Sequence, residues 1–171
     1  MGSVVDMAKV IIVYDSQSGF TEAMAKAVAE GANTVEGVDV DVFKVGTPFS
    51  ISELDKADAI VIGSPTIYGS VTSDMNVFLD CVKVHKESEQ LQGLHWLSGK
   101  VGGVFGSYGW DGGWVIEKLG AEMKALGIEV TAPAVSIVHD TYDKRIHLDA
   151  DAQQKCTVLG RSVAEKVSHK T

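Results

Sequence analysis

The chain has 171 residues, of which 45% are hydrophobic and 18 are glycine, and its net charge is -8. This length suffices for one well-buried core but not for two typical domains, so we expect one domain over residues 9–171 after a short extension, residues 1–8. The negative charge argues against binding nucleic acid through its phosphates. No apolar stretch approaches the roughly twenty residues of a membrane span, and the first residues do not resemble a signal peptide. We therefore expect a cytoplasmic protein that binds neither nucleic acid nor membrane.

The first apolar run, residues 10–14, is followed by a loop of hydroxyl and amide side chains and then by a helical pattern over residues 21–32. The loop, residues 15–21, is typical of an anion-binding turn, because Gly19 lets backbone N–H groups converge at the positive end of the helix. It lacks the lysine of a P-loop and the three glycines of a dinucleotide fingerprint, so a single phosphomonoester fits best. An ordinary turn in which Thr21 caps the helix is the alternative.

Apolar runs and helical patterns continue to alternate along the chain, as a doubly wound α/β sheet requires. The expected strands are residues 10–14, 38–43, 59–63, 101–105 and, less regularly, 130–138. The expected helices are residues 21–32, a short helix with a capping box over 52–55, and residues 73–84, 114–126 and 150–168. Because crossovers between parallel strands are right-handed and both faces must be covered, we predict a five-stranded parallel sheet of order 2-1-3-4-5, a flavodoxin-like fold.

Some details of these elements can also be predicted. Gly31 should end the first helix, and residues 85–98 should form an irregular surface excursion. Cys81 and Cys156 should be buried free thiols in a reducing compartment, since they lack C-x-x-C spacing. The third helix should turn a group of apolar side chains toward the core, namely Met75, Val77, Phe78, Leu79 and Val82.

Two further loops should meet the phosphate loop, because ligands of such sheets bind at the carboxyl ends of the strands where the strand order reverses. Residues 64–70 and 106–113 both combine aromatic side chains with glycines. Aromatic rings at loop tips bury poorly unless a flat group lies against them, and glycines let the backbone approach the edge of that group. The predicted ligand is flavin mononucleotide (FMN), a flat heteroaromatic monophosphate. Alternatively, Tyr108 and Trp110 simply plug the open end of the sheet.

Four segments, residues 13–16, 18–22, 63–66 and 105–110, make the chain resemble a flavodoxin, and most closely the flavodoxin domain of flavodiiron proteins. The resemblance implies a phosphate cradle made of Ser16, Gln17, Ser18, Gly19, Phe20 and Thr21. It also implies two groups of residues that flank the flavin ring, Pro65, Thr66, Ile67, Tyr68 and Gly69 from one loop, and Ser107, Tyr108, Gly109, Trp110 and Gly113 from the other.

The histidines do not form the metal centre that flavodiiron proteins carry in a separate domain. They are His85, His95, His139, His147 and His169, and they show no H-x-E-x-D or comparable cluster. We therefore expect exposed or packed histidines, no metal site, and no reduction of oxygen or nitric oxide by this chain alone.

The expected function is that of a low-potential one-electron carrier. A flavin accepts one or two electrons, and its protein environment decides how readily each is taken. A carbonyl at or near Gly69 can turn toward the ring when the ring gains a proton. Lysine and arginine are absent from the three loops, which disfavours negative charge on the reduced ring.

Redox partner proteins should dock at the flavin edge. Electron-transfer encounters are small and guided by charge, so an acidic rim would attract a basic partner surface. The candidate rim residues are Asp74, Glu87, Glu89 and Asp111. The sequence is compatible with either a monomer or a homodimer.

Two other functions stay open. Residues 63–66, the following Tyr-Gly pair and the helix from Ser73 also resemble FMN-dependent NAD(P)H:quinone oxidoreductases. Hydride transfer requires an open flavin face, which Tyr68 and Trp110 would restrict. A regulatory module that had lost the cofactor is a third possibility, but the phosphate-loop hydroxyls that such a module would lose first are present.

Overall fold

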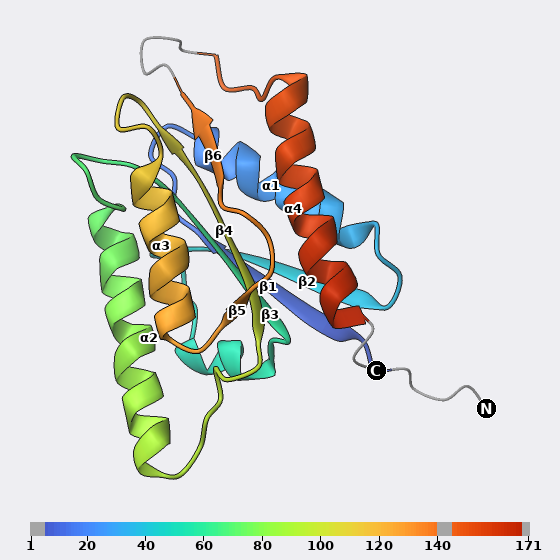
Figure 1. Cartoon of the computed structure of the whole chain (residues 1–171), viewed down its shortest axis with the longest axis vertical. Helices are drawn as coiled ribbons and strands as arrows, with labels where there is room; N and C mark the ends of the chain where they lie inside the picture. Colours follow the sequence, from blue (N-terminus) through green and yellow to red (C-terminus); the bar gives the residue numbers. More distant parts are fainter. Residues whose placement is uncertain (1–5, 140–144, 169–171) are drawn as a thin grey trace.

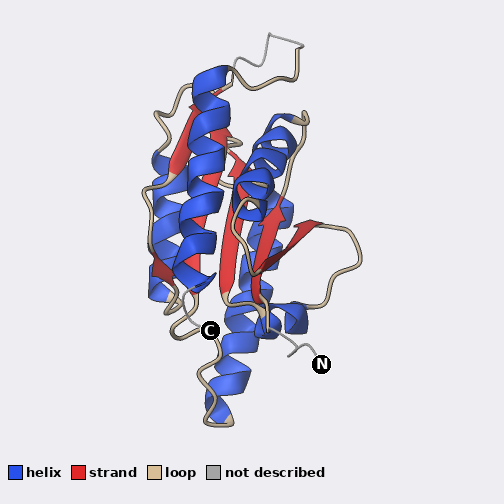
Figure 2. Cartoon of the chain, turned by 90° about the vertical axis from the view of Figure 1, so that its right-hand side faces the viewer, coloured by secondary structure: helices blue, strands red, loops and turns tan. Residues whose placement is uncertain are grey.

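The computed structural model describes residues 6–139 and 145–168. The strands are β1 (Ala8–Tyr14), β2 (Val38–Lys44), β3 (Ala59–Pro65), β4 (Val101–Tyr108), β5 (Glu129–Val130) and β6 (Val135–Val138). The helices are α1 (Phe20–Asn33), the 3-10 helix η1 (Ile51–Lys56), α2 (Ser73–Leu91), α3 (Trp114–Ala125) and α4 (Ala150–Ser168). The strands form a parallel sheet of order β2-β1-β3-β4-β5, which confirms the predicted fold and order. Helices α1 and α4 cover one face, and α2 and α3 cover the other (Figure 1, Figure 2).

The fifth predicted strand is divided into two segments that both pair with β4. β5 pairs with the start of β4 at Val101 and Gly102, and β6 pairs with its end from Phe105 to Tyr108. The intervening residues include Pro133, which has no N–H to donate to a ladder. The chain therefore leaves β4 for a few residues and returns to it, and β6 carries the backbone up to the end of the sheet that holds the three loops.

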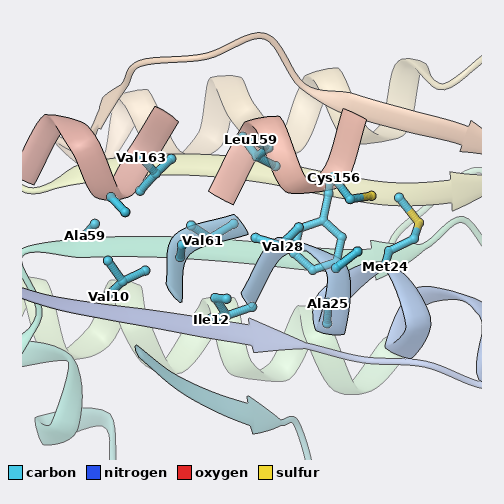
Figure 3. Close-up of a cluster of buried hydrophobic side chains, with 14 of the residues drawn as sticks. Val10, Ile12, Met24, Ala25, Val28, Ala59, Val61, Cys156, Leu159 and Val163 are labelled. Carbon is cyan, nitrogen blue, oxygen red and sulfur yellow. The ribbon is translucent and has the colours of Figure 1, made fainter. Parts of the chain in front are cut away.

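Two hydrophobic cores lie on opposite faces of the sheet because successive strand residues point to opposite sides. In β1, Val10 and Ile12 face α1 and α4, where they pack with Val28, Leu159 and Val163 (Figure 3). The neighbouring residues Ile11 and Val13 face α2, α3 and η1. Burial on both faces explains why the central strands read as continuous apolar runs.

Helices α1 and α4 touch through their backbones at two glycines. Gly31 does not end α1 as predicted, since the helix continues to Asn33. A Cβ atom on Gly31 would lie 2.0 Å from the carbonyl oxygen of Thr157, and one on Gly160 would lie 1.9 Å from that of Val28. The absence of side chains at these two positions fixes how closely α4 holds α1, which carries the phosphate loop at its N-terminus.

The excursion predicted for residues 85–98 is partly helical. α2 continues to Leu91, and its last turns project beyond the sheet (Figure 1). These turns are rich in residues with good helix propensity and need no apolar face. Their polarity therefore did not indicate an irregular segment. Nε2 of His85 lies 3.3 Å from Oδ1 of Asp55, which links α2 to η1. The His85 ring also packs edge-on against Trp96, with ring centroids 4.8 Å apart.

Three local predictions also need correction. Val77 points outward with 62% exposure, whereas the other four apolar residues of that prediction are buried. Cys81 is exposed, and only Cys156 is a buried thiol as expected. The short second helix is a 3-10 helix with Ser50 at its N-cap and no side-chain cap, so the capping box at Ser52 does not form. Within the described residues, no helix is long and apolar enough to cross a membrane.

Candidate cofactor site

The loop between β1 and α1 has the shape of an anion-binding turn. Gly19 has a φ of 96°, a left-handed value that residues with a Cβ rarely adopt. The hydroxyl of Ser16 accepts a hydrogen bond from the N–H of Gly19 at 3.0 Å, and that of Ser18 accepts one from the N–H of Phe20 at 3.3 Å. These bonds hold the loop closed at the positive end of α1, the geometry that suits a phosphate.

Thr21 joins α1 to β4 and does not cap the helix. It lies inside the first turn with 1% exposure, and its hydroxyl is 3.1 Å from the hydroxyl of Ser107 at the end of β4. The N-cap residue is Gly19, which has no side chain that could cap the helix. The alternative in which Thr21 caps the helix is therefore wrong, and this threonine fixes two of the three loops relative to each other.

A buried polar network lies below the loop and joins it to the start of α2. The carboxylate of Asp15, which is 7% exposed, accepts hydrogen bonds from the N–H of Ser16 and the hydroxyl of Thr72. Thr72 in turn caps α2 by accepting from the N–H of Met75, and it donates its own N–H to the hydroxyl of Ser64. Buried polar groups need such partners, so each member of the network holds the others in place.

Asp15 belongs to the predicted phosphate loop but was not predicted to contact the cofactor, and Thr72 was not predicted as part of the site. The position of Thr72 directly before an apolar helical pattern is an N-cap signal, which the sequence does contain. Its pairing with Asp15 across 57 residues has no local signal.

The loop after β3 ends in a tight turn whose tip carries Tyr68. Two backbone hydrogen bonds, 2.8 and 3.1 Å, join Ile67 and Ser70. Tyr68 and Gly69 have φ values of 49° and 74°, as in a type I′ turn. This conformation costs a residue such as tyrosine about 1–2 kcal/mol. The turn holds the Tyr68 ring fully exposed at one rim of the site.

The loop after β4 carries the second protruding aromatic side chain. Trp110 is 88% exposed, so it does not plug the end of the sheet. Gly113 is buried and serves packing, because a Cβ there would lie 2.9 Å from the Cβ of Ser136. Trp114 at the start of α3 lies next to the other loop, 3.8 Å from the position of a Cβ on Gly69. Trp114 was not predicted as a site residue, although it is 48% exposed and adjoins the rim.

The three loops border a cavity of about 410 Å³ at the carboxyl ends of the strands. Eight predicted residues line it, namely Gln17, Ser18, Pro65, Thr66, Ile67, Ser107, Tyr108 and Gly109. Two unpredicted residues, His139 and Ile146, complete the lining. The other predicted residues, Ser16, Gly19, Phe20, Thr21, Tyr68, Gly69, Trp110 and Gly113, shape the loops or form the rim.

Unpaired polar atoms in the lining fit a polar ligand. The hydroxyl oxygen of Thr66 and Nε2 of His139 are both buried and have no hydrogen-bond partner among residues 6–139 and 145–168. Such atoms are rare in folded proteins, so their occurrence in the wall of one cavity suits a group with several hydrogen-bonding atoms. The phosphate and ribityl chain of FMN is such a group, and the residues present fit it.

Two carboxylates, those of Asp15 and Glu22, lie near the phosphate loop. Burial raises the pKa of Tyr14, and the carboxylates of Glu22 and Asp15 raise it further. Among the described residues that line the cavity, none is lysine or arginine. An anion bound here is therefore held mainly by N–H and O–H groups.

The acidic rim predicted for partner docking is only partly in place. Glu87 and Glu89 lie in the later turns of α2, about 20 Å along the helix from its start at the site. Both carboxylate oxygens of Asp111 are buried, so this charge does not face a partner. Asp74, in the first turn of α2, is exposed.

The described histidines are exposed or packed, as predicted. His95 and His147 are exposed, and His85 packs against Trp96. His139 stacks on Phe20. His169 lies outside the described residues.

A doubly wound parallel sheet with a phosphate turn and two aromatic loops at its carboxyl ends defines a protein of the flavodoxin-like class. The flavodoxin family model matches residues 12–156, and the chain belongs to the flavodoxin family. Flavodoxins bind FMN and carry electrons between redox proteins, so family membership confirms the predicted cofactor and the predicted electron-carrier function.

Solved structures support the same assignment. The chain is similar to a flavodoxin from the domain Archaea at 34% identity, covering 94% of this chain and 99% of that one, with a TM-score of 0.77. It is also similar to rubredoxin oxygen:oxidoreductase from Desulfovibrio gigas at 25% identity, covering 96% of this chain and 38% of that one, with a TM-score of 0.76. The flavodiiron core of Flv1 from Synechocystis sp. PCC6803 shares the fold at 21% identity, with coverages of 97% and 37% and a TM-score of 0.75. The chain thus spans little more than a third of these two larger proteins, and the predicted resemblance to both groups is confirmed.

Proposed function

We propose that the chain is a low-potential FMN-dependent carrier that passes single electrons between redox proteins. The observation that carries this proposal is the convergence of three loops on one cavity, with an anion-binding turn on one side and two exposed aromatic rings at the rim. When bound, FMN supplies the electron-accepting chemistry of its flavin ring.

The residues of the chain hold and orient the cofactor. Ser16 and Ser18 shape the loop at the start of α1 by accepting hydrogen bonds from Gly19 and Phe20, and N–H and O–H groups of this loop would hold the phosphate at the positive end of the helix. Tyr68 and Trp110, which are exposed in this structure, would stack on the flat ring and shield it from water. The carbonyl of Gly69 or of a neighbouring peptide would be able to turn toward the ring edge and accept a hydrogen bond there, because glycine allows its peptide to rotate with little strain.

The charges of the site favour a low potential. With no lysine or arginine among the described residues of the cavity wall, negative charge gained on reduction has no cationic side chain to offset it there. In a partly desolvated site, such charge costs more free energy than in water. A second electron would therefore enter at a lower potential than the first.

Stepwise reduction followed by visible spectroscopy tests this function. The purified protein is expected to bind one FMN and to take up its electrons in two separate one-electron steps. A single two-electron step, or a protein that binds no added FMN, would contradict the proposal.

A second assay separates the carrier from the NAD(P)H:quinone oxidoreductase. We expect no turnover when NADH and benzoquinone are added to the FMN-loaded protein, because the carrier needs a partner protein to deliver electrons. Rapid oxidation of NADH without a partner would establish the reductase instead.

We also propose that residues 9–171 act as one FMN-binding domain and that redox partners dock at the flavin edge. Support for a single domain comes from the two cores, which draw on elements from β1 to α4. Support for the docking face comes from the exposed rings of Tyr68 and Trp110 at the cavity rim. The cytoplasmic location and the choice between monomer and homodimer stay predictions.

A further inference from the structure

His139 is fixed at the edge of the cofactor cavity by its main chain. It directly follows β6, whose last residue, Val138, pairs in register with Tyr108 at the end of β4. The N–H of His139 donates to the carbonyl of Tyr108 at 2.9 Å. The side chain therefore starts at the level where the loop after β4 begins, and it lines the cavity.

The imidazole is held flat against the first residue of α1. Its ring stacks on that of Phe20, with centroids 4.2 Å apart and an interplanar angle of 11°. Phe20 follows Gly19 directly, so the stack places His139 beside the phosphate loop, and Gln17 and Ser18 line the same cavity. Ile146 lies over the loop as well, since its Cγ2 atom is 3.6 Å from the position of a Cβ on Gly19.

One nitrogen of this ring, Nε2, has no hydrogen-bond partner among the described residues. This atom is buried. Leaving a buried polar group unpaired is costly, so an unpaired nitrogen in a cavity wall indicates a ligand atom that completes it. The carboxylates of Glu22 and Asp15 lie near the loop, and no lysine or arginine is among the described residues of the wall. Among the described residues of this wall, only His139 carries a basic side chain.

We propose that His139 binds the phosphate-bearing end of FMN by donating a hydrogen bond from Nε2. This inference rests on the proposed FMN function and adds a residue from the segment after β6 to the three predicted loops. Nε2 carries a hydrogen both in one neutral tautomer and in the protonated ring, so the bond is available in either form. Phe20 acts as the platform that orients the donor.

A comparison of FMN with riboflavin, which lacks the phosphate, tests the proposal. The apoprotein is titrated with each ligand by flavin fluorescence, as wild type and as His139→Phe, which keeps a flat ring on Phe20 but removes the N–H. We expect His139→Phe to weaken FMN binding by about tenfold or more, as for loss of a hydrogen bond to a charged group. Riboflavin binding should change by less than about twofold. His147→Phe, an exposed histidine of the same segment, is the matched control and should leave both affinities unchanged.

The outcomes are distinct. If His139→Phe weakens FMN and riboflavin by the same factor, or leaves FMN binding intact, His139 serves packing only and the proposal is overturned. If the wild type binds neither ligand, the proposed FMN function fails instead. If His139→Phe does not fold, nitrogen NMR of the wild-type imidazoles decides. FMN should shift the Nε2 resonance of His139 and riboflavin should not, and equal shifts would overturn the proposal.

Discussion

The two ends of the cofactor site are built in opposite ways. At the phosphate end, Asp15 and Thr21 are 7% and 1% exposed, and their side chains are hydrogen-bonded to other loops. At the ring end, Tyr68 and Trp110 are 100% and 88% exposed. The fold therefore holds the residues of the phosphate anchor in place before any ligand binds, whereas the aromatic rim contributes only when a flat ligand covers it. Changes at the anchor should therefore lower folding stability, and changes at the rim should lower ligand affinity alone.

The largest effect on folding stability is expected where α4 packs against α1, the helix that follows the phosphate loop. Gly160→Ala would place a Cβ 1.9 Å from the carbonyl oxygen of Val28, so α1 must move away. We expect the free energy of unfolding in urea to fall by about 3 kcal/mol or more. Arg161→Ala, on the exposed side of the same helix, should change it by less than about 0.5 kcal/mol. Equal, small losses would show that the position of α1 is not fixed by this contact.

The next largest effect is expected from Asp15→Ala. This change leaves the N–H of Ser16 and the hydroxyl of Thr72 without their buried acceptor, which should cost about 2–3 kcal/mol of unfolding free energy in the apoprotein. Asp39→Ala is the control, because this aspartate forms an exposed ion pair with Lys9 and should cost less than about 1 kcal/mol. If Asp15→Ala weakened FMN binding but left the apoprotein as stable as before, the anchor would not be built in advance.

At the rim, Tyr68→Gly should lower ligand affinity without lowering folding stability. Glycine adopts a φ of 49° without strain, so the apoprotein should keep its stability or gain up to about 1 kcal/mol. FMN affinity should fall by about tenfold, because the stacking surface is lost. Tyr68→Phe keeps the ring and should retain most of the affinity. Unchanged FMN binding by Tyr68→Gly would remove Tyr68 from the ring site.

The smallest expected effect is a difference in how fast the two thiols are modified near neutral pH. Cys156 is fully buried in the core between α1 and α4, and burial raises its pKa to about 12, whereas Cys81 is exposed. A disulfide reagent at about pH 8 should therefore modify one thiol quickly in the folded apoprotein and both in denaturant. Cys81→Ser should abolish the fast phase, and two fast thiols in the wild type would show that the anchor side opens readily.

The raised pKa of Cys156 also predicts a pH dependence with a defined sign. Because the folded pKa lies above the unfolded value of 9.0, the thiol's contribution to stability is complete below about pH 9 and is lost as the pH rises toward 12. The free energy of unfolding should thus fall with rising pH in that window, and Cys81→Ser should leave this slope unchanged. An apoprotein whose stability stayed constant from pH 9 to 11 would contradict the burial of Cys156.

Much of the fold could be predicted because its signals are local. Apolar runs such as residues 59–63 mark strands buried on both faces, and right-handed crossovers then determine the strand order. The place of the site followed from the same topology, since loops at the carboxyl ends of neighbouring strands must meet. For this reason the loop residues Gln17, Thr66 and Tyr108 were predicted correctly as neighbours.

Local sequence patterns were enough to predict the alternation of strands and helices, the three loops and the kind of ligand that they suit. The hydrogen bonds and packing contacts that support the site depend on the folded chain, because they join residues far apart along it. Asp15 meets Thr72 across 57 residues, and Thr21 meets Ser107 across 86. The stacking of His139 on Phe20 depends in the same way on where the edge strand returns to β4. No local pattern encodes such distances, since they are set by how closely sheet, helices and loops pack once the whole chain has folded.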